Sequence, residues 1–283
     1  MHAVTRGRRT GSALLHTQSR RTRAGHLEQS RSDLIRGNTL RNPRLYTPQP
    51  LVTDQYLTIT GQAAHHATHV LRLRTGASIR VFDGQGCEHQ VKLTEIIRSG
   101  IILKIREPVA VIPESPLELT LLQGIARNDR MDFILQKAVE LGVQTIQPIW
   151  MQRSHTRLKG ERLEKRINHW LGVIISACEQ CGRATLPQLL RPEDYLNWIN
   201  AGTGSELRLM LQPDARSCLR NLEKPASSIS ILVGPEGGLA PEEQALAMAT
   251  GFTGIRTGPR VLRTETAALA ALAGIQTLWG DFS

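Results

Sequence analysis

Two short runs near the C-terminus, each a candidate strand, end in a Gly-Pro turn that is followed by a helix-like segment. The first run, Ser228–Val233, is apolar and β-branched, as buried strands are, and it stops at the string GPEGG. The second run, Phe252–Thr257, stops at Gly258 and Pro259. This alternation predicts an α/β fold, in which ligands bind beyond the carboxyl ends of the strands. Both turns are therefore candidate walls of one binding site.

The glycine-rich turns do not match the common nucleotide-binding motifs. The chain contains no G-x-x-x-x-G-K-[ST] string, and Gly234 is followed by Gly237 and Gly238, which is not the G-x-G-x-x-G spacing. Glycine lets main-chain groups approach a ligand closely, but glycine and proline also punctuate ordinary loops. From the residues alone, a binding site and a pair of plain structural turns both fit.

Two strings, LVGPEGGLAPEE and GPRVLRTETAALAAL, resemble the signature of the RsmE family. Similar pieces occur in the same order upstream, at residues 42–51, 127–143 and 177–183. Members of this family are 16S ribosomal RNA uridine-N3 methyltransferases of the SPOUT superfamily. The resemblance implies a C-terminal SPOUT α/β domain with a deep trefoil knot, preceded by a small PUA-like β-barrel. It also implies S-adenosyl-L-methionine as cofactor and a homodimer.

The activity that the resemblance implies is methylation of N3 of a decoding-centre uridine in 16S rRNA. The partner is then naked 16S rRNA or the small ribosomal subunit. Because N3 lies on the Watson–Crick edge, the target base must be unpaired or flipped out. Two alternatives stay open: a knotted methyltransferase that acts on another RNA base, and a non-catalytic RNA-binding factor for ribosome assembly.

Main-chain groups at three strand ends are expected to hold the cofactor, the third being the end of the predicted strand Leu207–Leu211. The resemblance points to these cofactor-binding residues: Leu211, Gly234, Pro235, Glu236, Gly237, Gly238, Gly258, Arg260, Val261 and Leu262. A Gly237→Val substitution is expected to fill the space that the main chain needs and to block cofactor binding. Arg260 could alternatively pair with Glu236 and brace the two loops.

The catalytic candidates follow the last turn. Uridine N3 carries a proton and is a poor nucleophile until that proton leaves, so the site needs a base or a cation near the acceptor. Arg263 could stabilise negative charge on the uracil oxygens, and Glu265 could accept the N3 proton directly or through water. Glu265 could equally stabilise the N-terminus of the next helix, which Thr264 or Thr266 is expected to cap.

Positive charge is concentrated in the N-terminal part of the chain. The net charge of +10 divides into +6 for residues 1–40, +4 for residues 41–112 and zero for residues 113–283. We predict a disordered basic extension at 1–39, a PUA-like RNA-binding barrel at 40–112, a linker at 113–117 and a SPOUT methyltransferase domain at 118–283. The extension also fits a mitochondrial presequence, a nucleic-acid-binding tail, or translation upstream of a true start near Leu40.

Three arginines of the expected barrel are candidate RNA phosphate contacts: Arg44, Arg72 and Arg74. Arg72 and Arg74 flank Leu73, so burial of Leu73 would leave both arginines exposed. Phosphate contacts make RNA binding weaken with salt. Since only 4% of the residues are aromatic, a large stacking platform is not expected.

We expect no metal site and no membrane span. His65, His66 and His69 lie within a helical pattern, but no cysteine or acid nearby completes a metal shell. The pair Cys178 and Cys181 falls on one face of a helix, where cysteine packs as a small apolar residue. Four cysteines without a secretory signal, and apolar runs too short for a bilayer, indicate a cytoplasmic protein.

Overall fold

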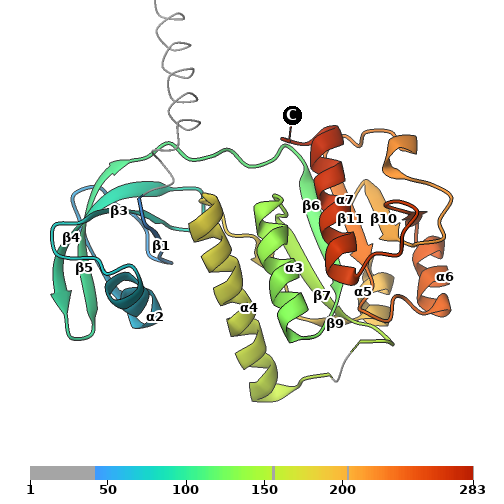
Figure 1. Ribbon diagram of the computed structural model, residues 1–283, viewed down its shortest axis with the longest axis horizontal. Coiled ribbons are helices and arrows are strands. Elements are labelled where there is room, and N and C mark those ends of the chain that lie inside the picture. The colour runs from blue at the N-terminus through green and yellow to red at the C-terminus, as the bar shows by residue number, and fades with distance from the viewer. Residues whose placement is uncertain (1–41, 155–156, 203, 283) are drawn as a thin grey trace, which may run out of the picture.

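The computed structural model describes residues 42–154, 157–202 and 204–282, and it contains two β-sheets (Figure 1). The first is a five-stranded sheet in the order β1-β3-β4-β5-β2. The second has the order β12-β10-β11-β6-β7-β8, with β9 paired to β7. The basic extension predicted for residues 1–39 lies outside the described residues.

The first sheet is mainly antiparallel, with only β1 and β3 running parallel. Its strands are β1 (Arg44–Tyr46), β2 (Tyr56–Thr60), β3 (Ser78–Phe82), β4 (Glu88–Ile97) and β5 (Gly100–Pro108). Alternate residues point inward, because successive side chains of a strand face opposite sides. Leu57, Ile79, Val91 and Leu103 are among the buried side chains of its own apolar core.

The helical pattern around the three histidines, predicted between Gln62 and Leu73, ends at Val70 in the structure. It consists of α2 (Gly61–His65) and a π-helical turn, η2 (His66–Val70), which lie against the first sheet. Only Ala64 and Ala67 are buried in these two elements, so the segment packs through small residues. The histidines are left on its more accessible side.

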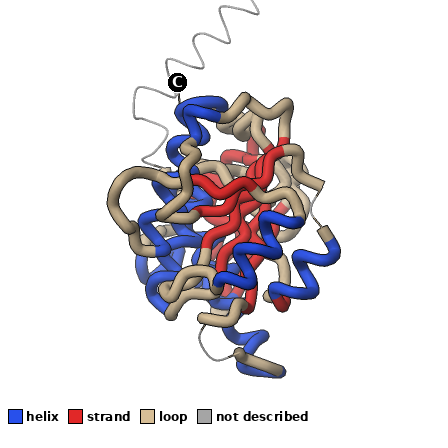
Figure 2. Tube along the Cα trace, turned by 90° about the vertical axis from the view of Figure 1, so that its right-hand side faces the viewer, coloured by secondary structure: helices blue, strands red, loops and turns tan. Residues whose placement is uncertain are grey.

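The second sheet is parallel throughout and lies between two layers of helices (Figures 1 and 2). Its strands are β6 (Glu118–Gly124), β7 (Thr145–Trp150), β8 (Gln188–Leu189), β9 (Glu193–Asp194), β10 (Leu207–Leu211), β11 (Ser228–Val233) and β12 (Thr253–Ile255). The helices are α3 (Asn128–Glu140), α4 (Gly160–Cys181), α5 (Tyr195–Ala201), α6 (Pro241–Ala249) and α7 (Thr264–Trp279), and a short 3-10 turn, η3, spans Leu219–Asn221. The α/β prediction is confirmed.

Alternation along the central strands assigns the helices to the two faces of the parallel sheet. Leu121 and Ile231 belong to one apolar cluster with α3, α4 and α7. Leu122 and Leu232, the next residues, belong to a second cluster with α5 and α6. The carboxyl ends of β10, β11 and β12 thus lie at one edge of a buried sheet. The trefoil knot implied by the resemblance stays a prediction.

The N-terminus of α7 is not capped as predicted. The capping residue is Arg263, and Thr264 is the first residue of the helix. The Thr264 hydroxyl donates to the main-chain oxygen of Gly234 at 2.6 Å and accepts from Gln123 Nε2 at 3.1 Å. These two bonds join α7 to the ends of β6 and β11. The Thr264 hydroxyl therefore makes tertiary contacts instead of the predicted cap.

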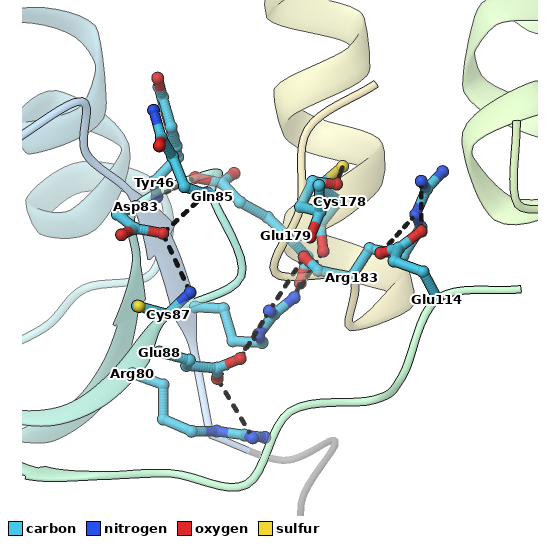
Figure 3. A network of polar contacts seen from close by, with 12 residues as sticks. Tyr46, Arg80, Asp83, Gln85, Cys87, Glu88, Glu114, Cys178, Glu179 and Arg183 are labelled. Atoms are coloured by element: carbon cyan, nitrogen blue, oxygen red, sulfur yellow. Dashed lines mark hydrogen bonds and ion pairs between the residues drawn. The ribbon is translucent and has the colours of Figure 1, made fainter. Parts of the chain in front are cut away.

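Arg44, one of the predicted phosphate contacts, lies in a buried polar network between the first sheet and α4; Figure 3 shows its partners Glu88, Cys178 and Arg183. Arg44 is buried, its Nη2 lies 2.8 Å from Glu88 Oε2, and its Nη1 donates to the main-chain oxygen of Cys178 in the last turn of α4. Nη2 also donates to the main-chain oxygen of Arg183 at 3.1 Å. A cation is favourable at a helix C-terminus, where carbonyl groups lack partners. Arg44 therefore joins the first sheet to α4, and protein groups enclose the guanidinium that was predicted to contact phosphate.

A second buried arginine holds the segment between the two sheets. Residues 109–117, which include the predicted linker, form neither helix nor strand. Glu114 of this segment accepts from Arg183 Nη2 at 2.6 Å, and Arg183 Nη1 donates to the main-chain oxygens of Val139 and Val143 (Figure 3). Ser115 donates to Gln276 Oε1 at 2.9 Å. These bonds tie the segment to α3 and α7, so it is not a free tether.

Candidate active site

A cavity of about 470 Å³ opens at the carboxyl ends of β10, β11 and β12. The segment after each strand contributes to its wall, and Arg130 and Arg153 complete the lining. All ten predicted cofactor-binding positions line it: Leu211, Gly234, Pro235, Glu236, Gly237, Gly238, Gly258, Arg260, Val261 and Leu262. The structure therefore brings the three predicted strand ends together. Contact of these residues with a cofactor stays a prediction.

The loop after β11 is compact because it contains glycine at two tight positions. A Cβ atom at Gly234 would lie 2.9 Å from the main-chain carbon of Gly238. Gly238 has φ of +70°, a value that favours glycine, and its N–H donates to the Pro235 oxygen at 2.9 Å. The turn thus folds back on itself and presents main chain to the cavity.

Arg153, which follows β7 and lines the cavity, supports the same loop. Its Nη1 donates to the main-chain oxygen of Gly237 at 2.8 Å. A Cβ atom at Gly237 would lie 3.0 Å from the Arg153 Cβ. A valine at 237 would therefore press on Arg153 as well as fill part of the cavity. The loss of cofactor binding predicted for Gly237→Val thus has two physical causes.

Glu236 pairs with Arg130 instead of the predicted Arg260. Its Oε1 lies 3.3 Å from Arg130 Nη1 and accepts from the Arg127 main-chain N–H at 2.9 Å. Arg260 is exposed and forms no ion pair with any residue that the structure describes. The N-terminus of α3 lies nearer to Glu236 and offers both a main-chain donor and a guanidinium. The brace between loops therefore runs through α3.

Glu265 lies in the first turn of α7, beside the cavity but outside its lining. Its side chain is 15% exposed and its Oε1 lies 4.0 Å from Arg130 Nε. Its Oε2 is buried and has no hydrogen-bond partner within the described ranges. An unsatisfied carboxylate oxygen is costly to bury, so a donor that came within hydrogen-bond distance of it would be favourable. Arg263, the other catalytic candidate, is exposed and lines the cavity.

Five arginines surround the cavity. The net charge of residues 113–283 is zero, so it gave no sign of this local positive charge. The arginines line the cavity together with one acid, Glu236, and they are Arg130, Arg153, Arg256, Arg260 and Arg263. Arg130 is one of the lining residues that the sequence reading missed, although it lies within the string at 127–143. The helical spacing gave no reason to single it out, because its partners, Glu236 and Glu265, lie over a hundred residues away.

Two of the three predicted RNA-contact arginines lie on the surface. Arg72 and Arg74 are exposed, and Leu73 between them is partly buried against the core of the first sheet. Arg72 has φ of +52°, so the chain turns sharply there. Their contact with phosphate stays a prediction.

The histidine and cysteine clusters show no sign of a metal site. The rings of His65 and His69 stack with centroids 4.2 Å apart. No group of three potential ligands occurs among the described residues. Cys178 is fully buried, and burial raises the pKa of its thiol to about 12. The thiol therefore stays protonated and inert at neutral pH.

The fold and the cavity are those of an RNA methyltransferase. The model of an RNA methyltransferase domain matches residues 113–276, and that of an RNA methyltransferase PUA domain matches residues 59–106. A ribosomal RNA small subunit methyltransferase E from Buchnera aphidicola is 31% identical over 240 residues, 85% of this chain and 95% of the relative. The chain belongs to the ribosomal RNA small subunit methyltransferase E family, so the RsmE resemblance is confirmed.

Two solved structures share the whole architecture. A ribosomal RNA small subunit methyltransferase E from Neisseria gonorrhoeae, bound to S-adenosyl methionine, is 40% identical with a TM-score of 0.82. The match covers 86% of this chain and 100% of the Neisseria chain. A methyltransferase from Legionella pneumophila, in complex with the same cofactor, is 34% identical with a TM-score of 0.82 and the same coverage. The predicted cofactor, S-adenosyl-L-methionine, agrees with the molecule bound in both of these structures.

None of the helices that the structure describes has the length and apolarity to cross a bilayer.

Proposed function

We propose that this chain transfers the methyl group of S-adenosyl-L-methionine to N3 of a decoding-centre uridine, the 1498 site, in 16S rRNA. The observation that carries the proposal is the cavity formed by three strand-end turns and rimmed by five arginines. Its combination of exposed main chain and positive charge suits a cofactor and an RNA strand together. The family membership supports the same assignment.

The residues present fit the cofactor. The cavity of about 470 Å³ lies within the range of small-molecule sites. Leu239, Val261 and Leu262 supply apolar wall, while the glycine turns at 234–238 and 258 supply main-chain groups for polar edges. The sulfonium of the bound cofactor supplies an already activated methyl group. The loops then have to hold the acceptor in line with that methyl group.

The residues near the N-terminus of α7 would prepare the acceptor. Arg263 lines the cavity and would stabilise the negative charge that develops on the uracil oxygens. Glu265 would accept the N3 proton directly or through water, and its Oε2 has no other hydrogen-bond partner among the described residues. Arg130 lies between Glu236 and Glu265 and would hold both carboxylates in place. Thr264 would hold this turn against the loop at Gly234.

The arginine rim would recruit the RNA. S-adenosyl-L-methionine carries only one carboxylate, so five guanidinium groups exceed what the cofactor can use. RNA phosphates match the remaining positive charge, and we expect the affinity for RNA to fall with salt. Arg72 and Arg74 would add phosphate contacts from the domain of the first sheet. The protein would act as a homodimer in the cytoplasm.

A methyl-transfer assay tests the function. The full chain is incubated with tritiated S-adenosyl-L-methionine and either unmodified small subunits or naked 16S rRNA, and the labelled RNA is digested to nucleosides. We expect label in 3-methyluridine, from a single uridine of the decoding centre. Label in another nucleoside would reassign the target base. Binding of RNA without any transfer would favour the non-catalytic assembly factor.

A further inference from the structure

A second cavity, of about 610 Å³, lies between α3 and α4 at the carboxyl ends of β6 and β7. Among its lining residues are Arg127, Arg130, Trp150, Arg166 and Trp170. Arg130 lines the cofactor cavity as well, so the two cavities share one guanidinium group. The predicted chemistry uses the first cavity only, and the second has no assigned role.

Trp170 provides a polar group that lacks its partner. Its side chain is 2% exposed, and its indole Nε1 has no hydrogen-bond partner in the parts of the chain that the structure describes. A buried N–H without an acceptor costs about 1–3 kcal/mol. A ligand in the cavity that carries an acceptor oxygen would remove this cost. Trp150, Leu158 and Leu163 supply apolar surface around it.

The charge of the lining favours an anionic or electron-rich ligand. Three arginines face one acid, Asp129, in this cavity. Arg166 is partly buried and forms no ion pair with a described residue, so its charge is available. Guanidinium groups bind phosphate and carbonyl oxygens, and aromatic side chains contact base rings. Arginine and tryptophan together are the side chains that bind unpaired nucleotides.

We propose that the second cavity takes an unpaired nucleobase of the RNA substrate, with a carbonyl oxygen accepting from Trp170 Nε1 and the phosphate beside Arg166. This proposal rests on the proposed function, because that function makes RNA the substrate. It adds a binding site for a second part of the same RNA strand. Arg130 couples the two cavities, because it contacts Glu236 of the cofactor loop at 3.3 Å and Glu265 at 4.0 Å. A base in the second cavity therefore positions the strand next to the cofactor turn.

Paired variants of α4 test this cavity. Arg166→Ala removes a lining guanidinium, and Arg162→Ala removes an exposed one that does not line it. Trp170→Phe keeps an aromatic ring but removes the N–H donor. We expect the KM for unmodified small subunits to rise about tenfold in Arg166→Ala and in Trp170→Phe, with kcat changed less. Arg162→Ala should keep the wild-type KM, and calorimetry should show wild-type cofactor affinity in all three.

Photo-crosslinking gives a second, direct readout. Unmodified small subunits whose 16S rRNA contains 4-thiouridine are irradiated with the full chain, and the crosslinked peptides are identified by mass spectrometry. We expect a crosslink to the peptide that contains Trp150 or Trp170. Crosslinks confined to other peptides, or wild-type KM in Arg166→Ala, would overturn the proposal. Loss of a dimer in Arg166→Ala would also overturn it, because a second copy would then occupy the cavity. If the wild-type chain methylates no RNA, the proposed function itself fails.

Discussion

Arg44 Nη2 and Glu88 Oε2 lie 2.8 Å apart, and their side chains are 5% and 2% exposed. Arg80 Nη1 lies 3.2 Å from the other oxygen of Glu88. The Arg44 guanidinium lies 4.6 Å from the centre of the Phe82 ring, and it also donates to the Cys178 carbonyl in the last turn of α4 and to the Arg183 carbonyl beyond it. A buried charge is stable only when it is paired and hydrogen-bonded. This cluster therefore fixes the first sheet against the helix that lines the second cavity.

Arg44→Ala is expected to destabilise the protein strongly. It removes the group that bonds Glu88 and the C-terminus of α4, and breaking a buried pair in this way costs about 3–5 kcal/mol. Urea unfolding should show the loss. Arg74→Ala, on the exposed turn, should change the free energy of unfolding by less than about 0.5 kcal/mol. Equal effects in the two variants would mean that the buried cluster does not hold the sheets together.

Gly234→Ala should weaken cofactor binding. The added Cβ would lie 2.9 Å from the main chain of the same loop, so the turn has to open. We expect the affinity for S-adenosyl-L-methionine, measured by calorimetry, to fall at least about tenfold, or 1.4 kcal/mol. Gly172→Ala is the control, because a Cβ there meets nothing within 4 Å on an exposed helix position. It should bind the cofactor normally and gain up to about 1 kcal/mol of stability.

Glu265→Gln separates the two roles considered for Glu265. If its carboxylate accepts the N3 proton, kcat for RNA methylation should fall about 100-fold, since proton transfer contributes at least that much. Cofactor affinity should stay at the wild-type value, because Glu265 lies outside the cavity lining. Rapid single-turnover assays with saturating cofactor provide the measurement. A rate near that of the wild type would leave only the helix-stabilising role.

Glu179 should make stability fall as the pH rises. Burial raises the pKa of its carboxyl group above the usual 4.5, although the Tyr46 N–H that donates to it opposes this. The folded state then holds the proton more tightly than the unfolded state, so the stabilisation is lost as pH rises from 4.5 through the folded pKa. Glu179→Gln keeps an acceptor for Tyr46. Urea unfolding from pH 4.5 upward should show a smaller decline in this variant; an unchanged decline would assign it to other groups.

Cys178 should resist alkylation in the folded protein. Burial raises the pKa of its thiol to about 12, so almost no thiolate is present at pH 8. Cys87 is exposed and should react with iodoacetamide under the same conditions. Peptide mass spectrometry after short labelling distinguishes the two. Modification of Cys178 at the rate of Cys87 would show that the end of α4 opens readily.

Local sequence signals predicted most of the elements that form the cavity at the ends of β10, β11 and β12. Ser228–Val233 and Leu207–Leu211 are strands with the predicted bounds, since buried strands carry continuous apolar runs. The predicted strand at 252–257 is shorter, at Thr253–Ile255, because the next residues line the cavity. The glycine positions of the loop after β11 could be predicted for a similar reason: glycine marks where the main chain turns or is approached closely.

The apolar runs, the Gly-Pro turns and the family strings thus determined, by themselves, the α/β class, the strand ends that build the cavity and the expected cofactor. Only the tertiary structure decided what each charged or hydroxyl group does. Arg44, predicted to bind phosphate, pairs with Glu88, and Thr264, predicted to cap, bonds Gly234. Arg130 meets two glutamates that are distant in the chain. The physical reason is that hydrophobic periodicity is a local property, whereas a polar group is satisfied by whichever partner the folded chain brings within hydrogen-bond distance.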